Sequence, residues 1–347
     1  MSFLLFLPLL FIYVFGLINL VGISPDLAFR HGVHFLTGVI LFFIVSKLKI
    51  RAHFLGINAH VLYWIFIGLL MLVLFFGLEV KGSRRWFDFY FFQFQPSEFF
   101  KIFFIIFLAQ IFSSYERHLQ KRTIFLKVLG YTLLPFILIF RQPDLGSAIV
   151  IFLISFVMML HSDVPKRHIL SFIIFVFLLL PAIWFVLHDY QRDRIISFIK
   201  PSYDLSGTSY NITQATIAIG SGKILGRGLG LGKQSSLYFL PEAQTDFAFS
   251  SFVEQFGFLG GFILILLYLF LFLSLFRKAH KFLNQKDRTT KFYYYYTIGF
   301  SALLVLQVAV NIGMNLRLLP IAGITLPFVS YGGSSLLTLM LGLALLP

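Results

Sequence analysis

Ten stretches of the chain are apolar over nearly their whole length, and most are separated by short polar segments. A transmembrane helix needs roughly 20 apolar residues, and most of the stretches approach that length. The pattern therefore predicts ten spans: residues 3–23, 32–48, 60–79, 94–113, 126–140, 145–161, 168–188, 247–276, 293–314 and 325–346. The first stretch lacks a charged leading region and a small-residue cleavage site, so we expect an anchor rather than a signal peptide.

One connection departs from this pattern. Residues 189–246 separate the seventh and eighth predicted spans, and they mix apolar stretches such as Ile212–Ile219 with glycines. Long loops are usually functional or disordered. Because this one is not of low complexity, we expect it to fold back onto the helices. The predicted fold class is an all-α polytopic membrane protein of about ten transmembrane helices, with residues 1–347 forming a single integral membrane domain.

Composition excludes two other classes of protein. Hydrophobic residues make up 59% of the chain and charged residues 12%, with a mean hydropathy of +0.89. Soluble domains carry about 25% charged residues, so both a soluble domain and a disordered chain are excluded. The absence of cysteine excludes disulfides, thiolate metal sites and cysteine nucleophiles. A net charge of +14 in such a chain indicates cytoplasmic Lys and Arg and anionic lipid rather than nucleic acid.

The distribution of basic residues predicts the orientation. The connections between spans 2–3, 4–5, 6–7 and 8–9, together with the span ends beside them, hold fifteen Lys and Arg, and the short connections on the other face hold six. Short cytoplasmic loops carry the excess of positive charge. We therefore expect a multi-pass membrane protein, with both termini cytoplasmic and residues 189–246 outside.

Ionisable residues beside apolar spans are costly and point to function, and two such groups lie near the third and fourth spans. Glu98 and Lys101 are three residues apart, so they share a helix face and can pair. One interpretation is an ion pair that only allows the helix to contain two charged residues. The other is that it places Lys101 near an anionic ligand. Arg84-Arg85-Trp86 is either an interfacial anchor or a site where Arg85 holds phosphate.

Two further groups flank the sixth and seventh spans. Asp144 follows Pro143 and is placed to N-cap the next helix. Arg192 and Arg194, with Asp193 between them, form either a self-paired solvated face or a site for a phosphate-bearing lipid.

The fifth group ends the long connection. Asp246 lies where the loop meets the eighth span, and Glu242 lies four residues earlier. Asp246 is a candidate N-cap. A carboxylate at an apolar boundary also has its pKa raised by desolvation, which suits a general base.

Three weaker signals carry no functional prediction. The glycine-rich string Gly226–Gly232 follows no strand and faces outward, so it is not a nucleotide loop. The nine histidines show no metal-ligand spacing. Ser334 and Ser335 lack a histidine partner at readable spacing, so a Ser/His/Asp triad is rejected.

Five strings in these segments carry a resemblance to a known family. They are Gln95-Pro96-Ser97-Glu98, Gln142-Pro143-Asp144-Leu145-Gly146, Ala218-Ile219-Gly220-Ser221-Gly222, Leu240-Pro241-Glu242 with Thr245-Asp246-Phe247, and Leu326-Pro327-Phe328-Val329-Ser330-Tyr331-Gly332-Gly333-Ser334-Ser335. Together they resemble the SEDS family of shape, elongation, division and sporulation polymerases, and the likeness covers most of the chain and implies the bacterial plasma (inner) membrane. Tyr190-Gln191 with Arg194-Ile195 is more similar to the RodA branch than to the FtsW branch.

The resemblance implies a peptidoglycan glycosyltransferase that polymerises lipid II, the undecaprenyl-pyrophosphate-linked disaccharide pentapeptide, for cell-wall elongation and rod shape. Transfer inverts the anomeric carbon, and Asp246 is the expected general base. Expected substrate-binding residues are Lys101, Glu98, Arg85, Arg192, Arg194, Asp144 and Glu242. No protein-bound metal is expected, although Mg²⁺ or Mn²⁺ at the pyrophosphate stays open. Expected partners are a class B penicillin-binding protein transpeptidase and other elongation-complex membrane proteins, without nucleic acid.

Two positions depart from the family's pattern, and two other functions stay open. Gln244 stands where the family usually has His, and Arg317 where it often has Gly. The glutamine argues against a histidine that assists at this site and does not touch Asp246. The alternatives are a lipid II flippase and a division-specific FtsW-type polymerase. A transporter of another solute would show inverted repeats, which the sequence lacks.

Overall fold

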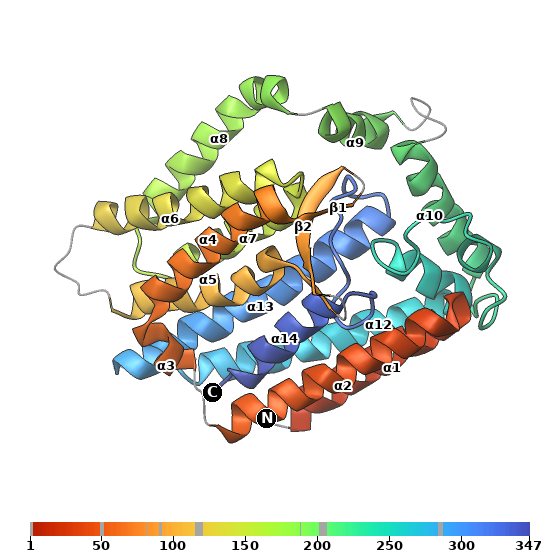
Figure 1. Ribbon diagram of the computed structural model, residues 1–347, viewed down its shortest axis with the longest axis horizontal. Helices are drawn as coiled ribbons and strands as arrows, with labels where there is room; N and C mark the ends of the chain where they lie inside the picture. The colour runs from red at the N-terminus through yellow and green to blue at the C-terminus, as the bar shows by residue number, and fades with distance from the viewer. Residues whose placement is uncertain are drawn as a thin grey trace.

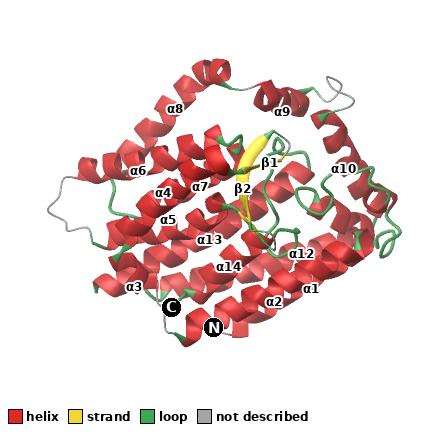
Figure 2. Ribbon diagram, viewed as in Figure 1, coloured by secondary structure: helices red, strands yellow, loops and turns green. Residues whose placement is uncertain are grey.

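The computed structural model describes residues 3–48, 52–80, 82–89, 92–114, 121–187, 189–200, 207–283 and 287–347. Helices dominate, and one small sheet lies among them (Figures 1 and 2). The elements are α1 (Phe3–Ile23), α2 (Pro25–Lys47), α3 (Ala52–Ile57), α4 (Ala59–Phe76), β1 (Leu78–Val80), β2 (Ser83–Asp88), β3 (Gln93–Phe94), α5 (Pro96–Ser113), α6 (Lys121–Arg141), α7 (Leu145–Leu160), α8 (Lys166–Val186), α9 (Asp189–Ile199), α10 (Thr208–Gly222), α11 (Lys233–Ser236), α12 (Ala248–His280), α13 (Arg288–Asn315) and α14 (Gly333–Ala344).

Each of the ten predicted spans coincides with a helix, namely α1, α2, α4 to α8 and α12 to α14. Among the described residues, seven helices are long and apolar enough to cross a membrane, and α7 and α14 are shorter apolar helices. The predicted fold class, an all-α polytopic membrane protein, is therefore confirmed.

The central helices are buried on nearly every side, and the peripheral ones are not. α5 lies in the middle of the molecule, with Phe100, Phe104 and Phe107 fully buried, and it packs against α13 and α4. A helix that is apolar all round belongs in such a position. In contrast, α8 and α9 arch away from the bundle in Figure 1, and Phe177 and Phe185 of α8 are exposed.

Two predicted spans have different limits in the structure. The second begins at Pro25 rather than residue 32, because proline fits the first turn of a helix. The last begins at Gly333 rather than residue 325. Before it, Phe328 has a φ of 65°, and the N–H of Leu326 donates to Ser330 Oγ (2.8 Å), so the chain turns instead of continuing as a helix.

The three-stranded antiparallel sheet, in the order β1-β2-β3, was not predicted. Its residues lie in a segment that we assigned to the end of the third span, a short connection and the start of the fourth span. Gly82 has a φ of 73° beside the β1–β2 turn, a conformation that glycine adopts at no steric cost. The hairpin matters because β2 places Arg85 above the start of α7.

From α10 onward the long connection folds back onto the helices as predicted, whereas α9 arches away (Figure 1). α10 packs against α12, and Ile212 and Ala215 of α10 share a buried cluster with Leu240 and Phe247. α12 is broken at Gly257, with a φ of 72° and a ψ of −172°.

The glycine-rich string satisfies the backbone groups that this break frees. The N–H of Arg227 donates to the carbonyl of Glu254 (2.8 Å), and that of Gly228 donates to the carbonyl of Gln255 (3.1 Å). The N–H of Gly230 donates to the Gln255 side chain (3.0 Å). These amides are therefore engaged with α12, which gives the string a structural role.

Candidate active site

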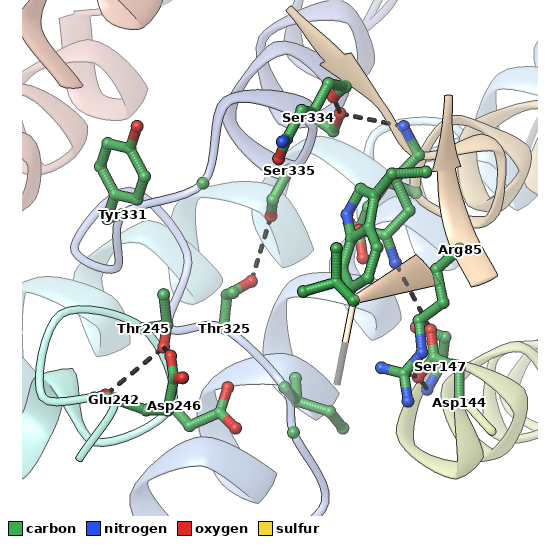
Figure 3. Close-up of a pocket in the computed structure, with 18 of the residues that line it drawn as sticks. Arg85, Asp144, Ser147, Glu242, Thr245, Asp246, Thr325, Tyr331, Ser334 and Ser335 are labelled. Atoms are coloured by element: carbon green, nitrogen blue, oxygen red, sulfur yellow. Dashed lines mark hydrogen bonds and ion pairs between the residues drawn. The ribbon is translucent and has the colours of Figure 1, made fainter. Parts of the chain in front are cut away.

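A cavity of about 990 Å³ opens among the starts of three helices, the β2 strand and two irregular loops (Figure 3). Residues from α2, β2, α5, α7, the turn before α12 and the loop before α14 line it. Four of the five family-like strings contribute side chains, because each one includes a helix start or a turn at this end of the bundle. The fifth string ends α10, where Gly222 lies against the backbone of Val253 in α12.

Asp144 caps α7 and forms the centre of a polar cluster. The N–H of Ser147 donates to its Oδ1 (3.2 Å), and Arg85 Nη1 lies 3.7 Å from the same oxygen. Gln95 Nε2 donates to its Oδ2 (3.4 Å). Arg85 also donates to the carbonyls of Gln142 and Pro143. Asp144 is 2% exposed, so these protein groups, and not solvent, balance its negative charge.

Glu98 and Lys101 form the ion pair that their spacing predicts. Lys101 Nζ donates to Glu98 Oε1 at 2.7 Å, with 3% of the lysine side chain and 11% of the glutamate side chain exposed. Both residues line the cavity from the first turns of α5. A buried cation without its partner would be very costly, so the pair stabilises this part of the helix whatever else it does.

The turn before α12 holds Asp246 by its backbone. Asn311 Nδ2 and Asn315 Nδ2 of α13 both donate to the Asp246 carbonyl (3.0 Å each). Thr245 Oγ1 donates to Glu242 Oε2 (2.7 Å), and Ser330 Oγ donates to the Thr245 carbonyl (2.6 Å). No hydrogen bond from the described residues reaches the Asp246 carboxylate, which faces the cavity.

Gly323 keeps the space beside this carboxylate open. A Cβ atom at position 323 would lie 3.7 Å from Asp246 Oδ2 and 3.9 Å from Arg194 Nη1, and the glycine has a φ of 68°. Arg194 Nη1 also donates to the Ile321 carbonyl (3.2 Å). The same short loop therefore lies next to both an acid and a cation.

The surroundings of Asp246 raise its pKa to about 6. Burial is the largest cause, and the negative charges of Glu242 and Asp144 add to it, while Arg194 and Arg85 oppose it. Asp246 is thus mostly ionised at neutral pH and still basic enough to accept a proton, as a general base must.

The structure brings six of the seven predicted binding residues into the cavity with Asp246: Lys101, Glu98, Arg85, Arg194, Asp144 and Glu242. Arg192 is not among the lining residues. Its guanidinium donates to the carbonyls of Trp184 and Phe185 (3.0 Å each) and contacts Asp189, so it caps the end of α8. Residues two apart on a helix do not face the same way, and this separates Arg192 from Arg194.

Several lining residues had no predicted role. Arg30 entered the sequence analysis only as an outer charge, and His34 only as one of nine histidines, yet both project from α2 into the cavity. Tyr331 lies inside a family-like string and was given no chemistry. Arg30 and His34 are spaced by one helical turn, and this spacing could have indicated a shared helix face. It was missed because residues 25–31 were assigned to a connection and not to the helix.

Glu254 is an acid within a span that the sequence analysis did not single out. It is 1% exposed, and it accepts from the N–H groups of Gln234 (2.8 Å) and Ser235 (3.0 Å) at the start of α11. Its oxygens are therefore occupied in holding the long connection against α12.

No group of three or more His, Asp or Glu side chains gathers in the described part of the chain in a way that could hold a metal ion. The expectation of Mg²⁺ or Mn²⁺ at the pyrophosphate stays a prediction.

Fold and cavity together define a polytopic membrane protein in which a carboxylate of raised pKa lies near arginine side chains. The chain belongs to the FtsW/RodA/SpoVE family of cell cycle proteins, whose pattern it matches over residues 1–347. It is 37% identical over 327 residues to a peptidoglycan glycosyltransferase MrdB of Helicobacter pylori, covering 92% of this chain and 81% of the relative. It is 38% identical over 286 residues to the MrdB of Escherichia coli K12, covering 81% and 74%.

Solved structures give the same result. A chain from a peptidoglycan synthase complex that coordinates polymerization and crosslinking superposes with a TM-score of 0.82 at 32% identity, covering 99% of this chain and 96% of that one. The rod shape determining protein RodA of Thermus thermophilus superposes with a TM-score of 0.71 at 28% identity, covering 99% and 95%.

Proposed function

We propose that this protein is a peptidoglycan glycosyltransferase that polymerises lipid II into glycan strands for cell-wall elongation. The curated relatives carry that activity in their names, and the structural relatives are RodA and a synthase complex. The observation that carries the mechanism is Asp246, an acid of raised pKa that lies beside Arg194 at the wall of a large cavity.

The reaction balances with the residues at hand. The 4-hydroxyl of the acceptor sugar attacks the anomeric carbon of the donor from the side opposite the leaving group. A new C–O bond forms, the bond to the donor's pyrophosphate breaks, and the configuration inverts. Asp246 takes the proton of the attacking hydroxyl. Arg194 and Arg85, whose charges act on Asp246, stabilise the negative charge of the departing pyrophosphate.

The remaining lining residues support these two groups. Lys101 adds positive charge to the cavity and Glu98 orients it, while Asp144 positions Arg85. Glu242 raises the pKa of Asp246. Mg²⁺ or Mn²⁺, if required, would arrive with the pyrophosphate and meet at most one or two of these carboxylates.

The direct test uses purified protein and labelled lipid II. Glycan strands on a gel, formed without any other enzyme, support the proposal. Their absence with folded protein contradicts it and favours a flippase. Addition of a class B penicillin-binding protein tests the proposed partner, which should bind this chain and cross-link the product.

The proposed orientation places the cavity outside and both termini in the cytoplasm. The chain has no cysteine, so single cysteines report their side of the membrane without background. Tyr238, 66% exposed in the long connection, should react with an impermeant thiol reagent after substitution by cysteine, and Leu283, 48% exposed between α12 and α13, should not. The reverse labelling pattern would invert the topology.

A further inference from the structure

Three cations that line the cavity, Arg85, Lys101 and Arg30, differ in their partners. Arg85 and Lys101 each have a carboxylate close by, from Asp144 and Glu98. Arg30, on the α2 wall, makes no ion pair among the described residues. The acid nearest to Arg30 along α2 is Asp26, one helical turn earlier, so the positive charge of Arg30 is available to an anion in the cavity.

The α2 wall is built as a polar corner. Arg30 and His34 are one helical turn apart, so they share a face, and the charge of Arg30 acts on His34. The His34 ring lies 5.9 Å from that of Tyr331. Its Nδ1 is buried and has no hydrogen-bond partner among the described residues.

Glycine at position 333 makes room for this ring. A Cβ atom there would come within 3.0 Å of the His34 ring. Arg30, His34 and Tyr331 all line the same cavity as Asp246.

The α2 side of this corner belongs to a different element from the proton acceptor, whereas Tyr331 is tied to the turn that carries it, because the Tyr331 N–H donates to the Gln244 carbonyl (2.8 Å). The cations that act on Asp246 are Arg194 and Arg85, and Arg30 is not one of them. Gly323 lies next to both the Asp246 carboxylate and Arg194. In Figure 3 the Tyr331 hydroxyl points toward the top of the view, and Asp246 lies below Tyr331.

The proposed reaction needs two anion sites at unequal distances from the base. Both substrates carry a lipid-linked pyrophosphate. The donor's pyrophosphate is bonded to the attacked carbon, so it leaves beside the base. The acceptor's pyrophosphate lies at the far end of a disaccharide from the hydroxyl that attacks. Cations beside Asp246 therefore suit the donor, and a cationic corner farther away suits the acceptor.

We propose that Arg30, with His34 and Tyr331, binds the pyrophosphate of the acceptor lipid II. This assignment rests on the proposed glycosyltransferase function. It divides the cavity into a donor region at Arg194 and Arg85 and an acceptor region on α2.

The test varies one substrate at a time. Labelled lipid II whose 4-hydroxyl is capped with galactose can act as donor and cannot act as acceptor. The initial rate of its transfer to unlabelled lipid II, measured at increasing concentrations of unlabelled lipid II, gives the half-saturating acceptor concentration. With Arg30→Gln we expect the half-saturating acceptor concentration to rise roughly tenfold or more, as for the loss of a hydrogen bond to a charged group. Arg30→Lys should recover much of this loss. The half-saturating donor concentration should not change.

A second acceptor tests whether the effect of Arg30 depends on the pyrophosphate. In this analogue a neutral ether linker replaces the pyrophosphate, and wild type and Arg30→Gln should use it equally. An equal loss with both acceptors, no loss with either, or a shift in the donor instead, would overturn the assignment. Failure of the wild-type protein to make glycan would refute the proposed function itself.

Two controls separate binding from folding. Arg317→Gln removes an exposed outer arginine that does not line the cavity, and it should leave both substrate concentrations unchanged. The melting temperature of Arg30→Gln should equal that of wild type, because Arg30 makes no ion pair within the described residues.

Discussion

The starts of α7 and α12 each bring an aspartate to the same cavity, and the two aspartates have opposite surroundings. Asp144 is the N-cap of α7, accepts the Ser147 N–H and lies 3.7 Å from Arg85. Asp246 stands one residue before the N-cap of α12, which is Phe247, and caps nothing. A shift of one residue thus leaves one carboxylate with its charge compensated and the other with its pKa raised to about 6.

The difference shows how a protein keeps a base available. Hydrogen bonds to the charged form of an acid lower its basicity, so a capping aspartate is a poor proton acceptor. Asp246 is held through its carbonyl by Asn311 and Asn315 instead. The turn is therefore fixed in place without occupying the carboxylate.

The largest expected effect comes from removing the base. Asp246→Asn should lower the rate of glycan synthesis by roughly 10²–10⁴-fold, because the amide cannot take the proton. The variant should still fold, since the carboxylate caps no helix. Polymerisation of labelled lipid II, measured by gel at matched protein levels, tests this.

Glu242→Gln is the control for that experiment. Glu242 lies on the same turn and also lines the cavity, so its substitution should leave more activity than that of Asp246. Near-normal synthesis by Asp246→Asn would remove Asp246 from the mechanism and direct the search to Asp144 or Glu242.

The next largest effect concerns Glu98, whose negative charge is paired with the positive charge of Lys101. Breaking a buried ion pair typically costs about 3–5 kcal/mol, so Lys101→Ala and Glu98→Gln should both reduce the amount of folded protein. The double variant Glu98→Gln with Lys101→Met should recover much of it, because no unpaired charge remains. Membrane yield and melting temperature measure this.

Lys101 would have a direct binding role if the result were different. Normal yield of Lys101→Ala together with lost polymerisation would show that the lysine acts on substrate. Equal losses for both single variants would support the structural role.

The two aspartates should also respond oppositely in stability. Asp144→Ala should lower the melting temperature, since loss of an N-cap typically costs about 0.5–2 kcal/mol. It also leaves Arg85 without its carboxylate partner. Asp246→Asn should not lower the melting temperature at neutral pH and should raise it slightly.

The sign follows from the raised pKa. The folded protein binds a proton at Asp246 more tightly than the unfolded chain does, so this acid's contribution to stability falls as pH rises from about 4 through about 6. An amide does not ionise and avoids that loss. A lower melting temperature for Asp246→Asn at pH 7.5 would contradict this account.

The sequence predicted the spans well because their signal is long and strong. Apolar runs near membrane length located ten helices, and the spacing of Glu98 and Lys101 predicted their ion pair. The β1-β2-β3 sheet was missed because strands of three, six and two residues carry too little periodicity within an aromatic-rich segment.

Contacts between distant segments were beyond the reach of sequence patterns. The cap at Asp144 was predicted, but its partner Arg85 comes from a different element 59 positions earlier. Both aspartates were readable as N-caps, and only the one-residue offset at Phe247 separates them. Arg192 was grouped with Arg194, although their side chains leave the helix in different directions.

The smallest effect is a shift in the pH at which activity appears. A general base must be ionised, so kcat/KM of the wild type should rise with pH and reach half its plateau near pH 6, the pKa of Asp246. Glu242→Gln removes a negative charge that raises this pKa, so the midpoint should move to lower pH. Arg194→Gln removes a positive charge that lowers it, so the midpoint should move to higher pH and the plateau should fall as well. Initial rates with labelled lipid II from pH 5 to pH 8 give all three curves. If both substitutions left the midpoint in place, the titrating group would not be Asp246, and its difference from Asp144 would have no catalytic meaning.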